Sequence, residues 1–282
     1  MPVPEEGGQP VMNERAMSEP RLLLYHDLTQ RGSIPAEQAA ERFEKQLSRI
    51  ASMGFRFATM TEYLAGELGP RDVVVTFDDA LRSFHQVAWP VLLRLSIPPT
   101  LFVVSEFAAR TDARDTLMSW DDVHEVAASG ATIGCHAASH VPLDQIPPEQ
   151  MRSEITRSLA AFAEQGLPTT TLAYPFGRYN EDVKATTEAA GFEAAFTVLK
   201  GGADRFEIRR RLLTGAENPA TLRLMLSDRF FTLRDAARGL IPRRYLKQEL
   251  PIAQSRWGAQ ALGLSAEQPA EQPEGSAPEG AA

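Results

Sequence analysis

Residues 73–80 have the sequence VVVTFDDA, an apolar run that ends in two carboxylates. The run Val73–Phe77 is rich in β-branched residues and shows no alternation of polar and apolar positions, which is typical of a strand covered on both faces. Parallel strands are covered in this way, because the helices that connect them lie over the sheet. Asp78 and Asp79 follow directly, so they stand at the carboxyl end of a predicted central strand.

The same alternation of apolar strands and helical stretches extends to both sides of residues 73–80. The predicted strands are Arg21–Tyr25, Phe55–Ala58, Val73–Phe77, Thr100–Val104, Thr132–Cys135, Thr171–Tyr174, Ala194–Val198 and a last one over Arg209–Leu213. The predicted helices, marked by capping residues and terminal glycines, are Ala36–Met53, Thr59–Leu68, Ser83–Leu95 with a kink at Pro90, Asp121–Ser129, Pro148–Gln165 and Glu181–Ala190. Parallel strands need such crossover connections, and about seven of them favour an α/β fold of the (β/α) barrel type. An open, doubly wound sheet is the alternative.

The composition and the apolar pattern argue against three broad classes of protein. Hydrophobic residues make up 43% and charged residues 23% of the 282 residues, so the chain can bury a core and is not disordered throughout. Lysine and arginine total 29 against 37 acidic residues, a net charge of −8, so nucleic acid is not an expected partner. The most apolar region, 87–104, is interrupted by Arg94 and three prolines, and no transmembrane segment is predicted.

The two ends of the chain differ in composition from its centre. Residues 1–20 and 265–282 lack apolar runs and are predicted to be disordered. The first of them shows no secretion signal, so we expect a cytoplasmic protein, or an exported or cell-surface one if the start is misassigned. The core domain is expected over 21–215, followed by accessory helices over 216–264. Within these, the basic stretch 223–256 is expected either to pack on the barrel or to form a peripheral contact with a membrane or another protein.

Metal-ligating residues gather where the predicted strands end, which is where barrel enzymes place their chemistry. His136 and His140 are four residues apart, and on one helical turn this spacing would bring both imidazoles to the same side. Asp79 can supply a third ligand and leave a position open for water, while Asp78 stays free as a base. Two histidines and a carboxylate suit zinc, cobalt, nickel or manganese. Cys135, next to His136 on a strand, is expected to face the core.

The strand-end residues resemble the motifs of the polysaccharide deacetylase family, with its NodB homology domain (carbohydrate esterase family 4). Thr76–Asp79 is similar to the first motif and His136-x-x-x-His140 to the second. This resemblance implies a distorted (β/α) barrel, with core motifs over 72–215, in which Asp78 is the catalytic base and a divalent ion, zinc first among the candidates, is held by Asp79, His136 and His140.

The segment Tyr174, Pro175, Phe176 and Gly177 resembles the third family motif, which forms a wall of the substrate groove. By this resemblance the backbone N–H of Phe176 helps to hold the oxyanion. The sequence around His26 and the short form of the third motif look most like the branch that deacetylates poly-β-1,6-linked N-acetylglucosamine.

Three departures from the family pattern affect the site. Ala80 stands where a glycine is usual, which is harmless unless the backbone there needs a positive φ. Ala173 replaces the arginine that orients the base, and Arg211 is a candidate substitute. No histidine follows His140, so the general acid is missing from its usual place; His26, a water molecule or Asp27 are the candidates.

The function that the resemblance implies is the metal-dependent removal of N-acetyl groups from a carbohydrate, with an N-acetylated glycan as the partner. Two alternatives remain at this point. One is the hydrolysis of a non-carbohydrate amide on the same barrel. The other is a catalytically silent carbohydrate-binding scaffold, which the replaced arginine and the missing acid both suggest.

Overall fold

The structure is a computed structural model and describes residues 20–198, 201–202 and 204–236. The predictions of disorder for 1–20 and 265–282 fall, apart from residue 20, outside the described residues. The part of the basic stretch 223–256 that follows residue 236 lies outside them as well. No helix in the described part of the chain is long and apolar enough to cross a membrane.

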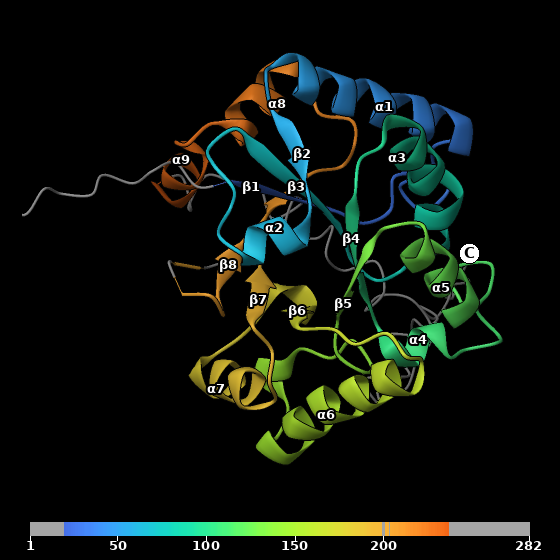
Figure 1. The fold of residues 1–282 in the computed structure, drawn as a ribbon, viewed down its shortest axis with the longest axis vertical. Helices are drawn as coiled ribbons and strands as arrows, with labels where there is room; N and C mark the ends of the chain where they lie inside the picture. Colours follow the sequence, from blue (N-terminus) through green and yellow to red (C-terminus); the bar gives the residue numbers. More distant parts are fainter. Residues whose placement is uncertain (1–19, 199–200, 203, 237–282) are drawn as a thin grey trace, which may run out of the picture.

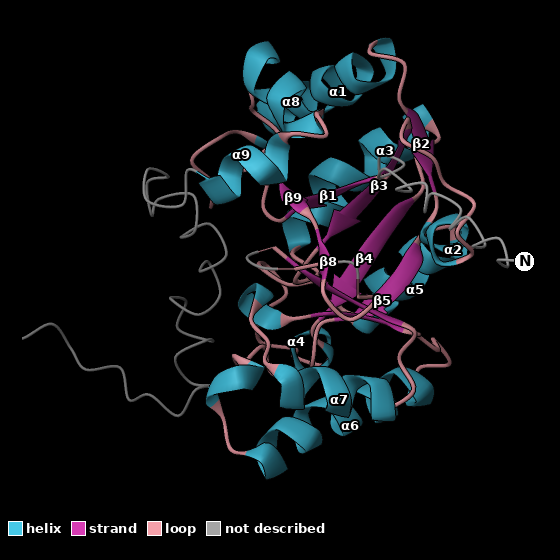
Figure 2. Cartoon of the chain, turned by 90° about the vertical axis from the view of Figure 1, so that its left-hand side faces the viewer, coloured by secondary structure: helices cyan, strands magenta, loops and turns pink. Residues whose placement is uncertain are grey.

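A single sheet of short parallel strands forms the centre of the molecule, and the helices lie around it (Figures 1 and 2). The strands occur in the order β8-β7-β6-β5-β4-β3-β1-β9, and β2 pairs with β3 beside this path. Their bounds are β1 Arg21–Tyr25, β2 Arg56–Ala58, β3 Asp72–Phe77, β4 Pro99–Val103, β5 Thr132–Cys135, β6 Thr171–Ala173, β7 Ala194–Thr197, β8 Ile208–Arg209 and β9 Arg211–Leu212. Every pairing is parallel, as the uninterrupted apolar run of β3 predicts.

One short segment closes the sheet into a distorted barrel. β8 pairs with β7 at one edge, with Ile208 opposite Phe196, and β9 pairs with β1 at the other edge, with Arg211 opposite Leu23. The predicted last strand is therefore present, but it is divided at Arg210, where it passes from one neighbour to the other. Because both edges of the sheet are paired by this segment, the open doubly wound alternative is wrong and the barrel prediction is confirmed.

Helices surround the barrel on the outside (Figure 2). Their bounds are α1 Ala36–Ser52, α2 Met60–Leu64, α3 Trp89–Leu95, α4 Ser105–Ala108, α5 Trp120–Ala128, α6 Pro148–Glu164, α7 Glu181–Ala189, α8 Pro219–Leu226 and α9 Phe230–Ala236, with short turns η1 Phe84–Ala88, η2 Leu143–Gln145 and η3 Pro175–Gly177. The predicted helix over Ser83–Leu95 is divided near Pro90 into the wider turn η1 and α3, because proline cannot donate a backbone hydrogen bond. Capping boxes begin α2 at Thr59 and α5 at Ser119.

The last two helices of the described chain lie against its first helix and strand, and α8 is next to α1 in both views (Figures 1 and 2). Leu222, Met225 and Leu226 bury the apolar side of α8. Buried Arg21 of β1 donates to the Leu226 carbonyl at 2.9 Å and pairs with Asp228. Of the two expectations for the basic stretch, packing on the barrel is therefore the one seen in its described part, residues 223–236.

The barrel interior leaves no room for a larger residue at one position of β5. A Cβ atom added at Gly134 would lie 2.4 Å from the ring of Phe102 and 3.0 Å from Oγ1 of Thr171, one on each neighbouring strand. Contacts this short require the Phe102 ring, or the strand that carries it, to move. The space at Gly134, directly before residues 135–140, therefore suits glycine.

We predict that Gly134→Ala lowers the free energy of unfolding by about 1–3 kcal/mol, because the added methyl group overpacks the interior. Urea denaturation of the purified variant measures this loss. Gly69→Ala is the matched control, since its Cβ would meet only Oδ2 of Asp72 at 3.9 Å. An equal loss in both variants would contradict the steric explanation.

Candidate active site

Four acidic and basic side chains meet at the carboxyl ends of two strands that are separated only by β4. Asp78 and Asp79 follow β3, while His136 and His140 follow β5. All four are buried, with exposed fractions of 2–6%. The parallel register of β3, β4 and β5 brings these strand ends to the same side of the barrel, as the sequence predicts.

Three of these residues form a group suited to a divalent cation. Nε2 of His136 lies 3.4 Å and Nε2 of His140 lies 3.3 Å from Oδ1 of Asp79. Their ligand atoms all lie within 4.8 Å of one another. Oδ1 of Asp79 is buried and has no hydrogen-bond partner among the described residues. A buried carboxylate oxygen that faces two imidazole nitrogens fits a cation, whereas without one its burial is costly.

The two histidines reach this position by a route that differs from the predicted one. Residues 136–140 form no helical turn, and Ala137 and His140 adopt left-handed backbone angles with φ of 62° and 60°. The helical-turn prediction is wrong, because the segment leaves β5 as an irregular loop with bends at Ala138 and Ser139. Nδ1 of His136 donates to the Ala173 carbonyl at 2.7 Å, which leaves Nε2 of this ring to face Asp79. The His140 ring packs against Phe176, with centroids 4.6 Å apart.

The backbone at Asp79 and Ala80 is also left-handed, with φ of 77° and 52°. The backbone at Ala80 thus needs a positive φ, so replacing the usual glycine is not harmless here. Alanine is strained at this φ and glycine is not. The Ala80 carbonyl accepts a 2.9 Å hydrogen bond from the amide of Met118, which holds the turn in place. The turn is what separates the directions of the two adjacent carboxylates.

Asp78 is held by an arginine from the segment that closes the barrel. Nη1 and Nη2 of Arg210 donate to Oδ1 and Oδ2 of Asp78, each at 2.7 Å, and both side chains are almost fully buried. The prediction that Arg211 takes this position is wrong. Neighbouring residues of an extended segment point to opposite sides, so Arg211 points away from Asp78 and is buried with its guanidinium 4.7 Å from the ring centroid of Phe231.

The charges in the site shift the pKa of each member. Burial raises the pKa of Asp78, but Arg210 and His136 lower it more, and the net pKa lies below its ordinary value. For Asp79, burial is likewise outweighed by the nearby imidazoles, and the pKa is lowered. Burial lowers the pKa of His140 to about 4. Both carboxylates are therefore ionised near neutral pH, and His140 is neutral, as a metal ligand must be.

The third predicted segment lies beside this group, but its residues face different ways. Tyr174 is buried, and its hydroxyl donates to the Phe206 carbonyl at 3.0 Å, on the side of Tyr179. Pro175 and Gly177 are buried as well, whereas Phe176 is half-buried, with φ of 60° and its ring against His140. A Cβ atom at Gly177 would lie 2.5 Å from a methyl group of Val198, so only glycine fits this turn.

His26 follows β1, the strand next to β3, and lies near both carboxylates. Its Nδ1 is buried without a hydrogen-bond partner among the described residues, while the ring as a whole is half-buried. Burial lowers its pKa, and the charges of Asp79 and Asp78 oppose this effect. Asp27 is differently placed, because its two oxygens accept from the amides of Thr29 and Arg31 and hold the turn that follows β1.

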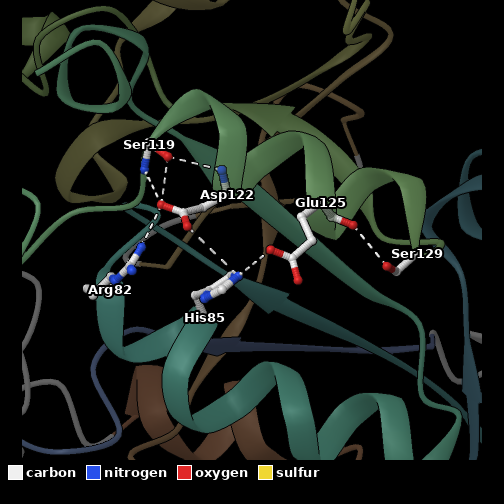
Figure 3. A network of polar contacts seen from close by, with 6 residues as sticks. All are labelled: Arg82, His85, Ser119, Asp122, Glu125 and Ser129. Carbon is white, nitrogen blue, oxygen red and sulfur yellow. Dashed lines mark hydrogen bonds and ion pairs between the residues drawn. The ribbon is translucent and has the colours of Figure 1, made fainter. Parts of the chain in front are cut away.

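A second cluster of possible ligands lies between η1 and α5 (Figure 3). Nε2 of His85 is 3.1 Å from Oε2 of Glu125 and 4.0 Å from Oδ1 of Asp122. Asp122 already pairs with Nη1 of Arg82 at 2.6 Å and accepts from the amide and hydroxyl of Ser119. Because Asp122 is neutralised by a cation of the chain itself, this cluster joins η1 to α5 and does not form a second centre.

Two residues at the site are missing from the candidates that the sequence provides. The candidate arginine is Arg211 and not its neighbour Arg210, and Glu154 of α6 belongs to none of the motifs. Glu154 accepts 2.8 Å hydrogen bonds from the amide and the hydroxyl of Ser139, between the two histidines. A signal exists for Glu154, because at helical spacing it shares a face with Met151, Ile155 and Ser158, where a carboxylate is out of place.

The comparisons with known proteins agree with this geometry. Residues 65–195 match the family model described as Polysaccharide deacetylase. YxkH of Bacillus subtilis, a protein named for the same family, is 27% identical over 190 residues, which cover 65% of this chain and 66% of that protein. Poly-β-1,6-N-acetyl-D-glucosamine N-deacetylase of Staphylococcus epidermidis is 23% identical over 193 residues, which cover 62% of this chain and 67% of that protein. The chain thus matches about two thirds of the length of these relatives.

Two solved structures have the same fold over most of the chain. The Streptococcus pyogenes deacetylase PplD, solved in complex with acetate, superposes with a TM-score of 0.65 and 22% identity, covering 75% of this chain and 100% of that one. IcaB from Ammonifex degensii gives a TM-score of 0.61 and 26% identity, covering 76% and 98%. In its barrel, in its buried Asp-His-His group and over residues 65–195, the chain is similar to the polysaccharide deacetylase family.

Proposed function

We propose that the protein is a metal-dependent hydrolase that removes N-acetyl groups from an N-acetylated glycan. The observation that carries this proposal is the division of roles between two adjacent carboxylates. Asp79 faces the two imidazoles, while both oxygens of Asp78 are taken by Arg210, with Oδ2 of Asp78 only 3.9 Å from Nε2 of His136. One carboxylate is thereby suited to bind a cation, and the other to act as a base beside it.

A divalent cation bound by Asp79, His136 and His140 supplies Lewis acidity and lowers the pKa of a nearby water molecule. Zinc is the first candidate, and cobalt, nickel and manganese share the same preference for such ligands. The chain's own contribution to this step is Asp78, which accepts the proton of the attacking water. Arg210 keeps Asp78 ionised and fixes the plane of its carboxylate.

The remaining groups act on the amide as it reacts. A bond forms between the water oxygen and the acetyl carbon, and the carbonyl oxygen gains negative charge, toward which the N–H of Phe176 is directed in this proposal. The bond between the acetyl carbon and the nitrogen then breaks, and the nitrogen takes a proton from the imidazolium form of His26, which becomes neutral. Burial opposes this protonated form, and the charges of Asp79 and Asp78 favour it. Acetate and a free amine are the products. Asp27 is a weaker candidate for the acid, because its oxygens already hold a turn.

The glycan that we propose is a polymer or oligomer of β-1,6-linked N-acetylglucosamine. The named relative from Staphylococcus epidermidis and the residues around His26 both support this substrate. Arg210 also answers the main argument for a silent scaffold, since an arginine orients Asp78 although Ala173 stands at the usual position. No contact of the described residues favours a non-carbohydrate amide.

We predict that Asp78→Asn lowers acetate release from N-acetylglucosamine oligomers by about 100-fold or more, because the amide cannot accept the proton. Acetate is measured with zinc-loaded protein, and bound zinc is measured in parallel. Treatment of the unchanged protein with a chelator is expected to abolish release, and added zinc to restore it. Equal release by the variant at equal zinc content would exclude Asp78 as the base.

We predict that Arg210→Lys lowers acetate release by about 10- to 100-fold, since lysine keeps the charge but cannot hold both oxygens of Asp78. Arg211→Lys is the matched control, because the Arg211 side chain is also buried but packs beside Phe231 and not on Asp78, and release is expected to stay within about twofold there. Turnover numbers of the two folded variants are compared. A larger loss in the control would contradict the assignment of Arg210.

We predict that His26→Ala lowers turnover by about 100-fold and leaves the zinc content unchanged, because the imidazole donates a proton without binding the cation. Asp27→Asn serves as the control, since asparagine keeps an oxygen that can accept from Thr29. Zinc content and acetate release are measured on the same samples. Loss of zinc from the His26 variant would rule out a role limited to proton donation.

A further inference from the structure

The loop between the two histidine ligands has a backbone that it cannot hold by itself. Ala137 and His140 are left-handed although neither is glycine, and the loop has no helical hydrogen bonds of its own. Such conformations persist only where the surroundings fix them. The contacts that do so come from two helices outside the loop, one before it and one after it in sequence.

The first half of the loop is fixed through its backbone by α4. The amide of Ser105 donates to the Ala137 carbonyl at 3.3 Å, and the amide of Glu106 donates to the Ala138 carbonyl at 3.0 Å. These bonds do not depend on any side chain. They leave the second half, Ser139 and His140, to be fixed by other means.

The second half is fixed by one buried carboxylate. Oε2 of Glu154 accepts from the amide of Ser139 and Oε1 accepts from its hydroxyl, each at 2.8 Å. Glu154 is 1% exposed, and Nη2 of Arg157, one turn further along α6, lies 2.6 Å from Oε1. Arg157 also pairs with Glu106 at 2.5 Å, so the guanidinium joins α6 to α4. Glu154 does not belong to the group of ligand atoms around Asp79.

We propose that Glu154 is a positioning residue for the metal centre, which holds His140 at the distance from Asp79 that a cation needs. The next residue after Ser139 is His140, whose Nε2 must lie opposite Oδ1 of Asp79. Without the carboxylate, the amide and hydroxyl of Ser139 would be buried without acceptors, and the loop would turn to satisfy them. This proposal rests on one part of the proposed function, the binding of a cation by Asp79, His136 and His140.

The test measures the dissociation constant of Zn²⁺ by competition with a chromophoric chelator, and the unfolding of the metal-free protein in urea. We expect Glu154→Ala to raise the dissociation constant 10- to 100-fold, which is the effect of removing a group that orients a ligand. We expect Ser139→Ala, which keeps the backbone bond, to raise it less. Glu164→Ala, an exposed carboxylate on the same helix, is the matched control and is expected to leave it unchanged.

The conservative variant separates positioning from charge. In Glu154→Gln the amide oxygen can accept from the Ser139 N–H and the NH₂ group can donate to its hydroxyl, but this NH₂ group cannot accept from Arg157. We therefore expect zinc affinity to recover in part. Weakened zinc binding in Glu154→Ala and Ser139→Ala that Gln partly restores supports the proposal. Unchanged zinc affinity in either alanine variant, with only the urea midpoint lowered, would overturn it and leave Glu154 a structural residue.

The two proposals fail in different ways. Zinc binding without acetate release by the unchanged protein would end the proposed deacetylase activity and leave the role of Glu154 standing. If Glu154→Ala does not fold, the comparison of Ser139→Ala with Glu164→Ala decides the matter alone. Equal zinc affinity in those two variants would then overturn the role of Glu154.

Discussion

The buried pair of Asp78 and Arg210 is the interaction on which the architecture and the chemistry both depend. Two adjacent carboxylates cannot both be ionised inside a protein unless each has its own counter-charge. Arg210 neutralises Asp78, and the imidazole-lined space at Asp79 fits a cation. Arg210 occupies its place because the segment that carries it pairs with β7 on one side and β1 on the other. The same segment thus closes the barrel and orients the proposed base.

Backbone strain is concentrated at the strand ends that form the site. Left-handed residues other than glycine occur at Asp79 and Ala80 after β3, at Ala137 and His140 after β5, and at Phe176 after β6. Each of these turns is held by groups from elsewhere in the chain, such as the Met118 amide or the Glu154 carboxylate. Rigid neighbours allow side chains from different strands to keep the fixed distances that a metal centre requires.

Local pattern was sufficient to predict the barrel and to select Asp79, His136 and His140, which the structure brings together, since covered strands and polar residues at their ends are visible in a single sequence. It failed where a choice depended on distant contacts. Arg209–Arg211 are three arginines in a row, so no alternation of polar and apolar residues shows which of them faces the barrel interior. The sequence therefore does not distinguish Arg210 from Arg211. The spacing of His136 and His140 suits a helical turn equally well, and only the packing of α4 and α6 selects the loop.

Because Arg210 lies late in the chain, the proposed metal ligands are synthesised before the arginine that orients Asp78. Residues 79–140 contain all three proposed ligands, whereas the partner of Asp78 lies 132 residues beyond it. On the ribosome, the ligands emerge while the arginine is still to be translated. The nascent chain therefore holds its metal-binding residues before it can orient its proposed base. An unfinished or truncated chain that ends before the closing segment would contain every ligand and still lack the oriented Asp78.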